Sequence, residues 1–286
     1  MTAALSPSRA ADFKQCPLLY RFRVVDRIPA PPSPAAARGT LVHAVLERVF
    51  DLAAEQRTPE AAVGLLPQAW AALVEEEPEL ATMIADDETL DEEAWFTQAA
   101  TLVQKWFGLE DPTRLEPQER ELYVETTVDT GDADGLVLRG YVDRLDVAPT
   151  GAMRVVDYKT GRSPNERFEA KALFQMKFYG LVLWRTRGQI PALLQLVYLG
   201  DGEVVRYVPD ERDLLALEAN LKAVWAAIDR AARTGDWRPS PSRLCDWCDY
   251  RDLCPAWGGT PPPLPDDAVA RALDPRVTGA APKNDD

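Results

Sequence analysis

Three aspartates and a lysine stand in one short segment, residues 140–161, which reads GYVDRLDVAPTGAMRVVDYKTG. Asp157 and Lys159 are two residues apart in an otherwise apolar run, so in a β-strand both side chains project from one face while Tyr158 points away. A short antiparallel connection would bring Asp143 beside them. Carboxylates placed in this way offer oxygen ligands to Mg²⁺, and the lysine could orient or deprotonate an attacking water and offset charge on a scissile phosphate.

These aspartates also have a second interpretation, because aspartates near strand ends often serve as edge charges or turn caps. The apolar strand around Asp157 and Lys159 makes that interpretation less favourable, since an unpaired charge on a buried face is costly. Asp146 lies three residues from Asp143, so regular alternation places it on the other face and outside the proposed site.

The period of the hydrophobic residues predicts the elements that must position this site. From residue 120 the apolar residues alternate in three segments separated by GDADG and PTGA, which predicts a meander of three strands. Residues 41–50 and 166–187 repeat at helical spacing. Two further strands, ALLQLVYL and EVVRYV, surround a GDG turn, and residues 210–233 form a long amphipathic helix.

The chain has 286 residues, of which 46% are hydrophobic, and this is enough for one large core. We assign residues 1–258 to a single α/β domain with a mixed central sheet flanked by helices. Within it, residues 51–118 are rich in Ala, Leu and Trp and are interpreted as a helical insertion. Residues 259–286, with PPPLP and scattered charges, are expected to form a disordered tail.

The net charge of −14 is unusual for a nucleic-acid-binding protein, because lysines and arginines make the phosphate contacts. The acidity is concentrated in residues 75–93, which hold ten acidic side chains and no basic one. Residues 154–187 hold eight basic side chains against three acidic ones, which favours a basic surface near the site. No apolar run is long enough to span a bilayer and no signal peptide begins the sequence, so we expect a cytoplasmic protein without a membrane partner.

Most of the chain outside residues 51–118 resembles the RecB-type exonucleases of the PD-(D/E)XK superfamily, which include AddB-like and CRISPR-associated four-cysteine nucleases. The segments that carry the resemblance are LSPSRAADFKQCPLLYRFR, GTLVHAVLE, GYVDRLD, VVDYKTG and FQMKFYG, together with the cysteines near the C-terminus. The resemblance implies a restriction-endonuclease-like fold. It also implies that Asp143 and Asp157 bind a metal ion and that Lys159 serves the attacking water.

The same resemblance assigns roles that spacing alone leaves open. His43 is the one histidine of the chain, and a lone histidine on a helix is more often a cap or core residue, but the resemblance implies an additional metal ligand. Gln175 and Tyr179 resemble the family's QxxxY element, which implies contact with substrate or support of the lysine rather than an ordinary helix surface. The superfamily often has a further acid upstream, and no local pattern selects between Glu119 and Glu121.

All four cysteines fit one ligand set, and in a reducing compartment they are metal ligands rather than disulfides. They are Cys16, Cys245, Cys248 and Cys254. Four thiolates can hold zinc or a [4Fe-4S] cluster, although the spacing C-x₂-C-x₅-C does not repeat the paired knuckles of most zinc ribbons. The resemblance, with one cysteine before the nuclease core and three after it, implies a [4Fe-4S] cluster that staples residue 16 to residues 245–254 and stabilises the folded state.

We therefore expect a Mg²⁺- or Mn²⁺-dependent deoxyribonuclease. By resemblance it is an exonuclease on single-stranded or end-containing DNA in repair, recombination or defence. The rival interpretation is a binding or scaffold module that keeps the cluster but has no activity, and the presence of all the proposed catalytic residue types opposes it. An iron-sulfur electron carrier is a third interpretation, which the lack of a GxGxxG fingerprint disfavours. The chain has no GxxxxGK[ST] motif, so ATP-driven unwinding would need a helicase partner.

Overall fold

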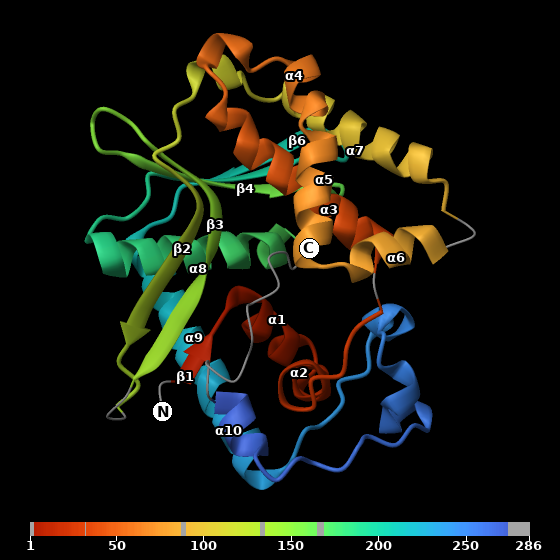
Figure 1. The fold of residues 1–286 in the computed structure, drawn as a ribbon. Helices are drawn as coiled ribbons and strands as arrows, with labels where there is room; N and C mark the ends of the chain where they lie inside the picture. Colours follow the sequence, from red (N-terminus) through yellow and green to blue (C-terminus); the bar gives the residue numbers. More distant parts are fainter. Residues whose placement is uncertain (1–2, 32, 87–89, 132–134, 165–168, 274–286) are drawn as a thin grey trace.

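The computed structural model describes residues 3–31, 33–86, 90–131, 135–164 and 169–273, and these residues fold around one six-stranded sheet (Figure 1). The strands are β1 (Ala3–Leu5), β2 (Glu119–Val128), β3 (Leu136–Val147), β4 (Met153–Lys159), β5 (Leu193–Tyr198) and β6 (Glu203–Tyr207). Their order is β1-β3-β4-β5-β6, and β2 also pairs with β3. One edge of β3 therefore carries β2, while its other edge carries β1 at the start and β4 at the end.

The sheet is mixed, as the sequence predicted. β2, β3 and β4 form the expected antiparallel meander, β4 and β5 are parallel, and β5 and β6 form an antiparallel hairpin. β1 runs parallel to the start of β3 and was not predicted. Three residues are too few to show the alternation by which a strand is recognised in a sequence.

Helices cover both faces of the sheet. They are α1 (Pro7–Gln15), α2 (Pro17–Tyr20), α3 (Pro34–Arg48), α4 (Pro59–Gly64), α5 (Leu66–Glu76), α6 (Glu79–Asp86), α7 (Glu92–Trp106), α8 (Glu169–Arg187), α9 (Glu211–Thr234) and α10 (Ala268–Leu273). Val155 of β4 packs in the hydrophobic cluster that contains α8 and α9, whereas Val156 packs in the cluster that contains α3 and α7. The alternation of β4 thus separates two cores, and the mixed sheet flanked by helices is confirmed.

Residues 51–118 contain α4, α5, α6 and α7 and supply most of one layer of the fold. Trp95 and Trp106 of α7 are 1% and 0% exposed, and both lie in the same hydrophobic cluster as Tyr158 of β4. Trp95 also donates a hydrogen bond of 2.8 Å from Nε1 to the carbonyl of Pro34, which ties α7 to the start of α3. The segment is therefore part of the core, because without it one face of the sheet would be open to water.

A buried ion cluster joins this helical layer to the sheet. Arg144 of β3 is 1% exposed, and its guanidinium donates hydrogen bonds of 2.9 and 2.7 Å to the two carboxylate oxygens of Glu110. It also donates to the Tyr158 hydroxyl and pairs with Asp146 at 3.1 Å, while Trp106 Nε1 donates to Glu110 at 2.9 Å. Burial raises the pKa of Glu110, but the hydrogen bonds and charge of Arg144 lower it by more, so the carboxylate is ionised at neutral pH.

The N-terminal and C-terminal segments lie side by side at one end of the molecule (Figure 1). The ring of Tyr20 stacks on Trp237 with centroids 5.9 Å apart, and its hydroxyl donates to the carbonyl of Ala272 at 3.0 Å. The Tyr250 hydroxyl donates to the carbonyl of Ile28 at 3.1 Å. Ordinary packing and hydrogen bonds thus connect the two ends of the described chain.

α10 lies in the segment that the sequence assigned to a disordered tail. Ala268 and Ala272 are 3% and 2% exposed, and the Arg271 guanidinium donates to the carbonyl of Val25 at 3.3 Å. Residues 259–273 therefore have a defined place, contrary to that expectation, and residues 274–286 lie outside the described residues. In the part of the chain that the structure describes, no helix is both long and apolar enough to cross a bilayer.

The buried ion cluster predicts a large effect of Arg144→Met on stability. The substitution keeps most of the side-chain volume but leaves the Glu110 carboxylate buried without its cation, so we expect a loss of about 3–5 kcal/mol in the free energy of unfolding. Urea unfolding followed by circular dichroism measures it. The matched control is Arg233→Met, because the Arg233 side chain is 64% exposed and its pair with Asp229 should contribute at most about 1 kcal/mol. Equal losses in the two variants would contradict this account.

Candidate functional site

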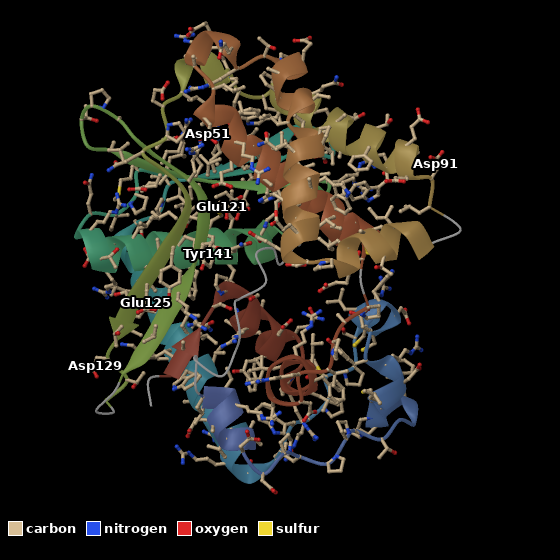
Figure 2. All side chains as sticks on the ribbon, in the orientation of Figure 1. Asp51, Asp91, Glu121, Glu125, Asp129 and Tyr141 are labelled. Carbon is tan, nitrogen blue, oxygen red and sulfur yellow. The ribbon has the colours of Figure 1, made fainter. Side chains whose placement is uncertain are left out.

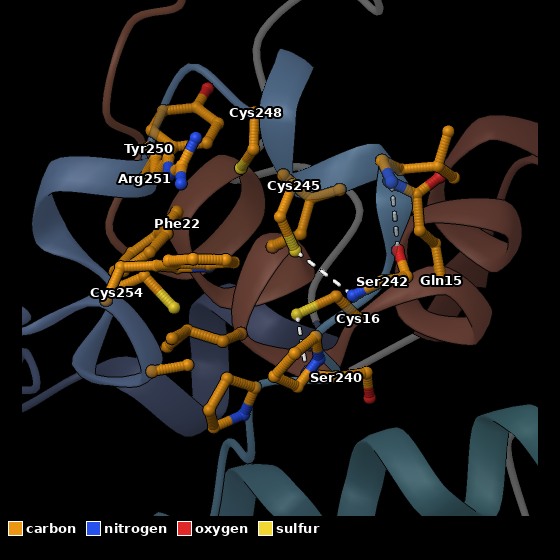
Figure 3. A pocket seen from close by; sticks show the side chains of 17 residues that line it. Gln15, Cys16, Phe22, Ser240, Ser242, Cys245, Cys248, Tyr250, Arg251 and Cys254 are labelled. Carbon is orange, nitrogen blue, oxygen red and sulfur yellow. Dashed lines mark hydrogen bonds between the residues drawn. The ribbon is translucent and has the colours of Figure 1, made fainter.

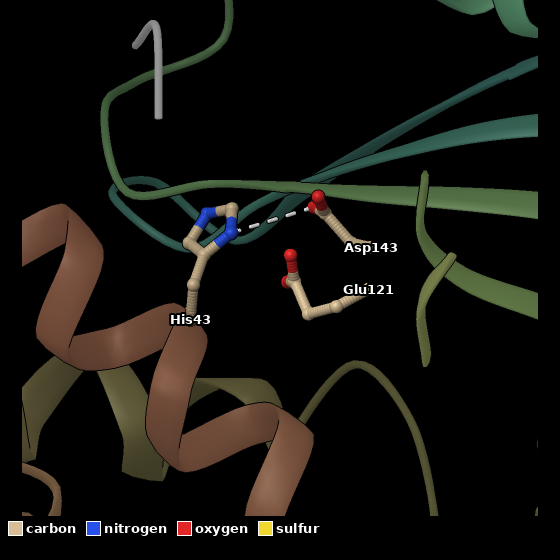
Figure 4. Close-up of side chains that lie close together, drawn as sticks. All are labelled: His43, Glu121 and Asp143. Carbon is tan, nitrogen blue, oxygen red and sulfur yellow. Dashed lines mark ion pairs between the residues drawn. The ribbon is translucent and has the colours of Figure 1, made fainter. Parts of the chain in front are cut away.

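Three side chains from three different elements lie close together (Figure 4). They are His43 of α3, Glu121 of β2 and Asp143 of β3, and one ligand atom from each lies within 4.8 Å of the other two. His43 is 7% exposed, and its Nδ1 lies 3.5 Å from Asp143 Oδ2. Two carboxylates and an imidazole at this separation can hold a divalent metal ion.

The backbone at Glu121 differs from that of a regular strand. Its φ is +45°, in the left-handed region that side chains other than glycine rarely adopt. In the ladder of β2 and β3, Arg120 pairs with Arg144 and Leu122 pairs with Val142. Glu121 and Asp143 therefore lie opposite each other, but they do not form a regular backbone pair. Like charges placed directly across a ladder repel each other, and strained backbone is often found at functional sites. A bound cation would offset this repulsion.

Of the two upstream acids that the sequence left open, Glu121 is the one that lies with His43 and Asp143. Glu119 is two residues earlier, is exposed, and does not belong to the group of ligand atoms. The sequence could have identified Glu121 only from the register of the hairpin, in which Glu121 faces Asp143.

Asp157 and Lys159 project together, as their spacing predicted. Lys159 Nζ lies 3.1 Å from Asp157 Oδ2, and Asp157 is 2% exposed. Tyr158 points into the opposite core, and its backbone N–H donates a hydrogen bond of 2.7 Å to Asp143 Oδ2. The Asp143 carboxylate is thus held against β4 at the position between Asp157 and Lys159. Asp157, a predicted metal ligand, is not in the group formed with His43; it lies on β4, next to Tyr158, whose N–H binds Asp143.

Gln175 and Tyr179 lie on α8 with a hydrogen bond of 3.1 Å between Gln175 Nε2 and the Tyr179 hydroxyl. Burial raises the pKa of Tyr179, and the nearby charge of Asp157 raises it further, so the group remains a neutral hydroxyl. A Cβ atom at Gly140 would lie 2.7 Å from Tyr179 Cε1, so only glycine fits here without displacing the ring. The glycine that begins GYVDRLD thus allows the α8 tyrosine to approach β3.

The four cysteines line one pocket between the N-terminal helices and the C-terminal segment (Figure 3). Cys16 Sγ accepts a hydrogen bond of 3.4 Å from the backbone N–H of Ser240, and Cys245 Sγ accepts one of 3.3 Å from Ser242. Among the described residues no three cysteine sulfurs lie within 4.8 Å of one another. The thiols are therefore not gathered around a single point as a zinc ion would require, with Zn–S bonds of about 2.3 Å, and the structure does not establish the iron-sulfur staple.

A fold of this kind, with acids and a lysine on adjacent strands of a mixed sheet, is that of a metal-dependent nuclease. Residues 4–255 match the PD-(D/E)XK nuclease superfamily, and the chain belongs to this superfamily. Its members use divalent metals and act on DNA.

Individual relatives are distant but cover the chain. The Gene 69 proteins of Mycobacterium phages D29 and L5 are 26% and 22% identical to it, over 88% of this chain and 96% of each relative. A solved structure from Eubacterium rectale, named provisionally as an exonuclease, has a TM-score of 0.53 and 14% identity, covering 87% of this chain and 88% of that one. This likeness supports the fold.

The position of Glu121 predicts its contribution to metal binding. Glu121→Gln removes a charged ligand, so Mn²⁺ affinity measured by calorimetry should fall at least about tenfold, the smallest effect usually seen even when only an outer-shell partner is lost. Glu119→Gln is the matched control, because it removes the same charge from the same strand outside the group, and its affinity should stay near wild type. Equal weakening by both variants would indicate a general charge effect instead of ligation.

Proposed function

We propose that this chain is a Mg²⁺- or Mn²⁺-dependent deoxyribonuclease of RecB type that acts as an exonuclease. The observation that carries the proposal is the grouping of His43, Glu121 and Asp143 next to the Asp157–Lys159 pair. The donor set fits a divalent cation, because carboxylate oxygens suit both metals and the imidazole adds a nitrogen ligand that Mn²⁺ accepts readily. Asp157 is proposed as a further ligand from the neighbouring strand.

The residues divide the chemistry of phosphodiester hydrolysis between them. A divalent cation, when bound, would act as a Lewis acid toward the scissile phosphate. Lys159 is held at 3.1 Å by the buried Asp157, so its ammonium group has a fixed position from which it can orient the attacking water or offset charge on the phosphate. The Tyr179 hydroxyl, with Gln175 beside it, supports this lysine or contacts the substrate.

The proposed substrate is DNA that is single-stranded or has a free end, in repair, recombination or defence. A helicase is the proposed partner wherever duplex DNA must first be unwound. The alternative function is an inactive binding or scaffold module, and the paired position of Asp157 and Lys159 favours the enzyme, since a module without activity has no need of it.

The function predicts different effects of removing a ligand and removing the lysine. Asp143→Ala should abolish cleavage and weaken Mn²⁺ binding, because it removes a metal ligand. Lys159→Ala should leave metal binding intact while slowing single-turnover cleavage by a factor on the order of 10² to 10⁴, the usual range for a positioned acid-base group.

Calorimetry with Mn²⁺, DNA anisotropy in Ca²⁺ and cleavage of labelled DNA in Mg²⁺ measure these effects. The matched control is Lys105→Ala, because Lys105 lies outside the site and its Nζ donates a hydrogen bond to the carbonyl of Gly200. Wild-type cleavage by Lys159→Ala, or a wild-type chain that cuts no DNA with any divalent metal, would favour the inactive module.

We also propose that the four cysteines bind a [4Fe-4S] cluster. The proposal is supported by their position around one pocket and by the amide hydrogen bonds to the sulfurs of Cys16 and Cys245, a feature that stabilises thiolate ligands. A cluster of four irons is larger than one zinc ion, so it suits thiols that are further apart.

Anaerobically purified protein should therefore contain iron and acid-labile sulfide, measured by elemental and colorimetric analysis. Cys16→Ser should lower the iron content and the thermal stability about as much as Cys248→Ser, since both remove one ligand of the same site. Stoichiometric zinc without sulfide, or a Cys16→Ser variant with full iron content, would contradict the proposal.

A further inference from the structure

Two tyrosines form an exposed pair on the ribbon made by β2 and β3. Tyr123 and Tyr141 are directly opposite each other in the ladder, and their ring centroids are 5.3 Å apart with the planes tilted by 57°. Tyr123 is 46% exposed and Tyr141 is 37% exposed, so neither ring belongs to a hydrophobic core. The pair therefore presents aromatic surface to solvent.

The pair occupies the position in the ladder next to the candidate metal ligands. Tyr141 precedes Asp143 by two residues on β3, and Tyr123 follows Glu121 by two residues on β2. Two residues of an antiparallel strand span about 6.8 Å. Figure 2 shows Glu121, Tyr141 and Glu125 along this stretch of the ribbon. A phosphate bound at the ligands would therefore have its neighbouring nucleoside within reach of the rings.

We propose that Tyr123 and Tyr141 form a stacking site for an unpaired base next to the scissile phosphate. This inference rests on the proposed nuclease function and adds to it a site that binds the base rather than the phosphate. Every base offers an aromatic face, so stacking on tyrosine is independent of sequence and contributes about 1–3 kcal/mol per base. A base inside a duplex is already stacked on both sides, so the site takes single-stranded ends or frayed nucleotides.

Two opposite charges border the edge of the Tyr123 ring. Its hydroxyl donates a hydrogen bond to Glu125, and the Arg139 side chain also interacts with this hydroxyl, so the two charges offset each other. Stacking of a neutral base on the ring face depends little on either charge. A cross-strand aromatic pair also stabilises its own ribbon, by roughly 0.2–1 kcal/mol, and the test must separate that contribution from binding.

The test compares Tyr141→Leu and Tyr123→Leu with the matched controls Tyr141→Phe and Tyr123→Phe, which keep the ring. Binding in Ca²⁺ is measured by anisotropy with three DNAs: a single strand, a fully abasic strand of the same length, and a duplex whose two ends are closed by linkers without bases. Each leucine variant should bind the normal single strand about 5- to 150-fold more weakly, which corresponds to the range for one stacked base. The phenylalanine variants should bind like wild type.

Two further comparisons separate stacking from structure. The wild-type advantage over the leucine variants should disappear with the abasic strand and with the closed duplex, and Mn²⁺ affinity should be the same in all variants. Equal weakening on the normal and abasic strands would mean that the tyrosines only stabilise the ribbon, and wild-type binding by both leucine variants would also overturn the proposal. If the wild-type chain binds single strands through these rings but never cuts, the nuclease function fails while the stacking site stands.

Discussion

The buried guanidinium of Arg144 is the interaction on which the geometry of the site depends. It contacts Glu110 after α7, the Tyr158 hydroxyl of β4 and Asp146 within β3, so one charged group connects the helical layer and two strands. Arg144 follows Asp143 directly in the chain. Tyr158 stands between Asp157 and Lys159, and its backbone N–H holds Asp143. Arg144 and Tyr158 also line the same small pocket as His43, Glu121 and Asp143, so fixing these two side chains fixes one wall of the site.

The sequence was sufficient to predict the strands of the site but not their register. Alternation in the apolar strand β4 placed Asp157 and Lys159 on one face and Tyr158 on the other, and the structure agrees. Glu121 could not be identified in this way, because its identification depends on knowing which residue of β2 pairs with which residue of β3. A slip of one position turns every side chain to the other face. The register of a hairpin depends on the conformation of its loop, which the loop sequence alone does not specify here.

Long-range packing explains what else the sequence did not reveal. β1 is defined by pairing with β3, more than a hundred residues later, and α10 by contacts with residues near Tyr20 and Val25. Composition alone made residues 259–273 resemble a solvated tail. Side-chain contacts, such as Tyr20 on Trp237 and Tyr250 on Ile28, already hold the N-terminal segment against the C-terminal segment. Ligation of Cys16 together with the C-terminal cysteines would therefore strengthen this packing and would not be needed to create it.

An acidic chain that binds DNA must obtain its DNA affinity from contacts near the site, because its net charge repels phosphate. The basic stretch 154–187 was expected to provide a positive surface, but Lys177 pairs with Asp213 at 3.7 Å and Arg185 with Glu218 at 2.5 Å, so much of that charge is offset within the protein. The site itself is acidic until a cation binds, which makes metal and phosphate binding mutually dependent. Base stacking has no such requirement, since it involves neutral groups and is little affected by a net charge of −14. Exposed rings beside the ligands therefore supply the kind of contact that this charge distribution leaves available.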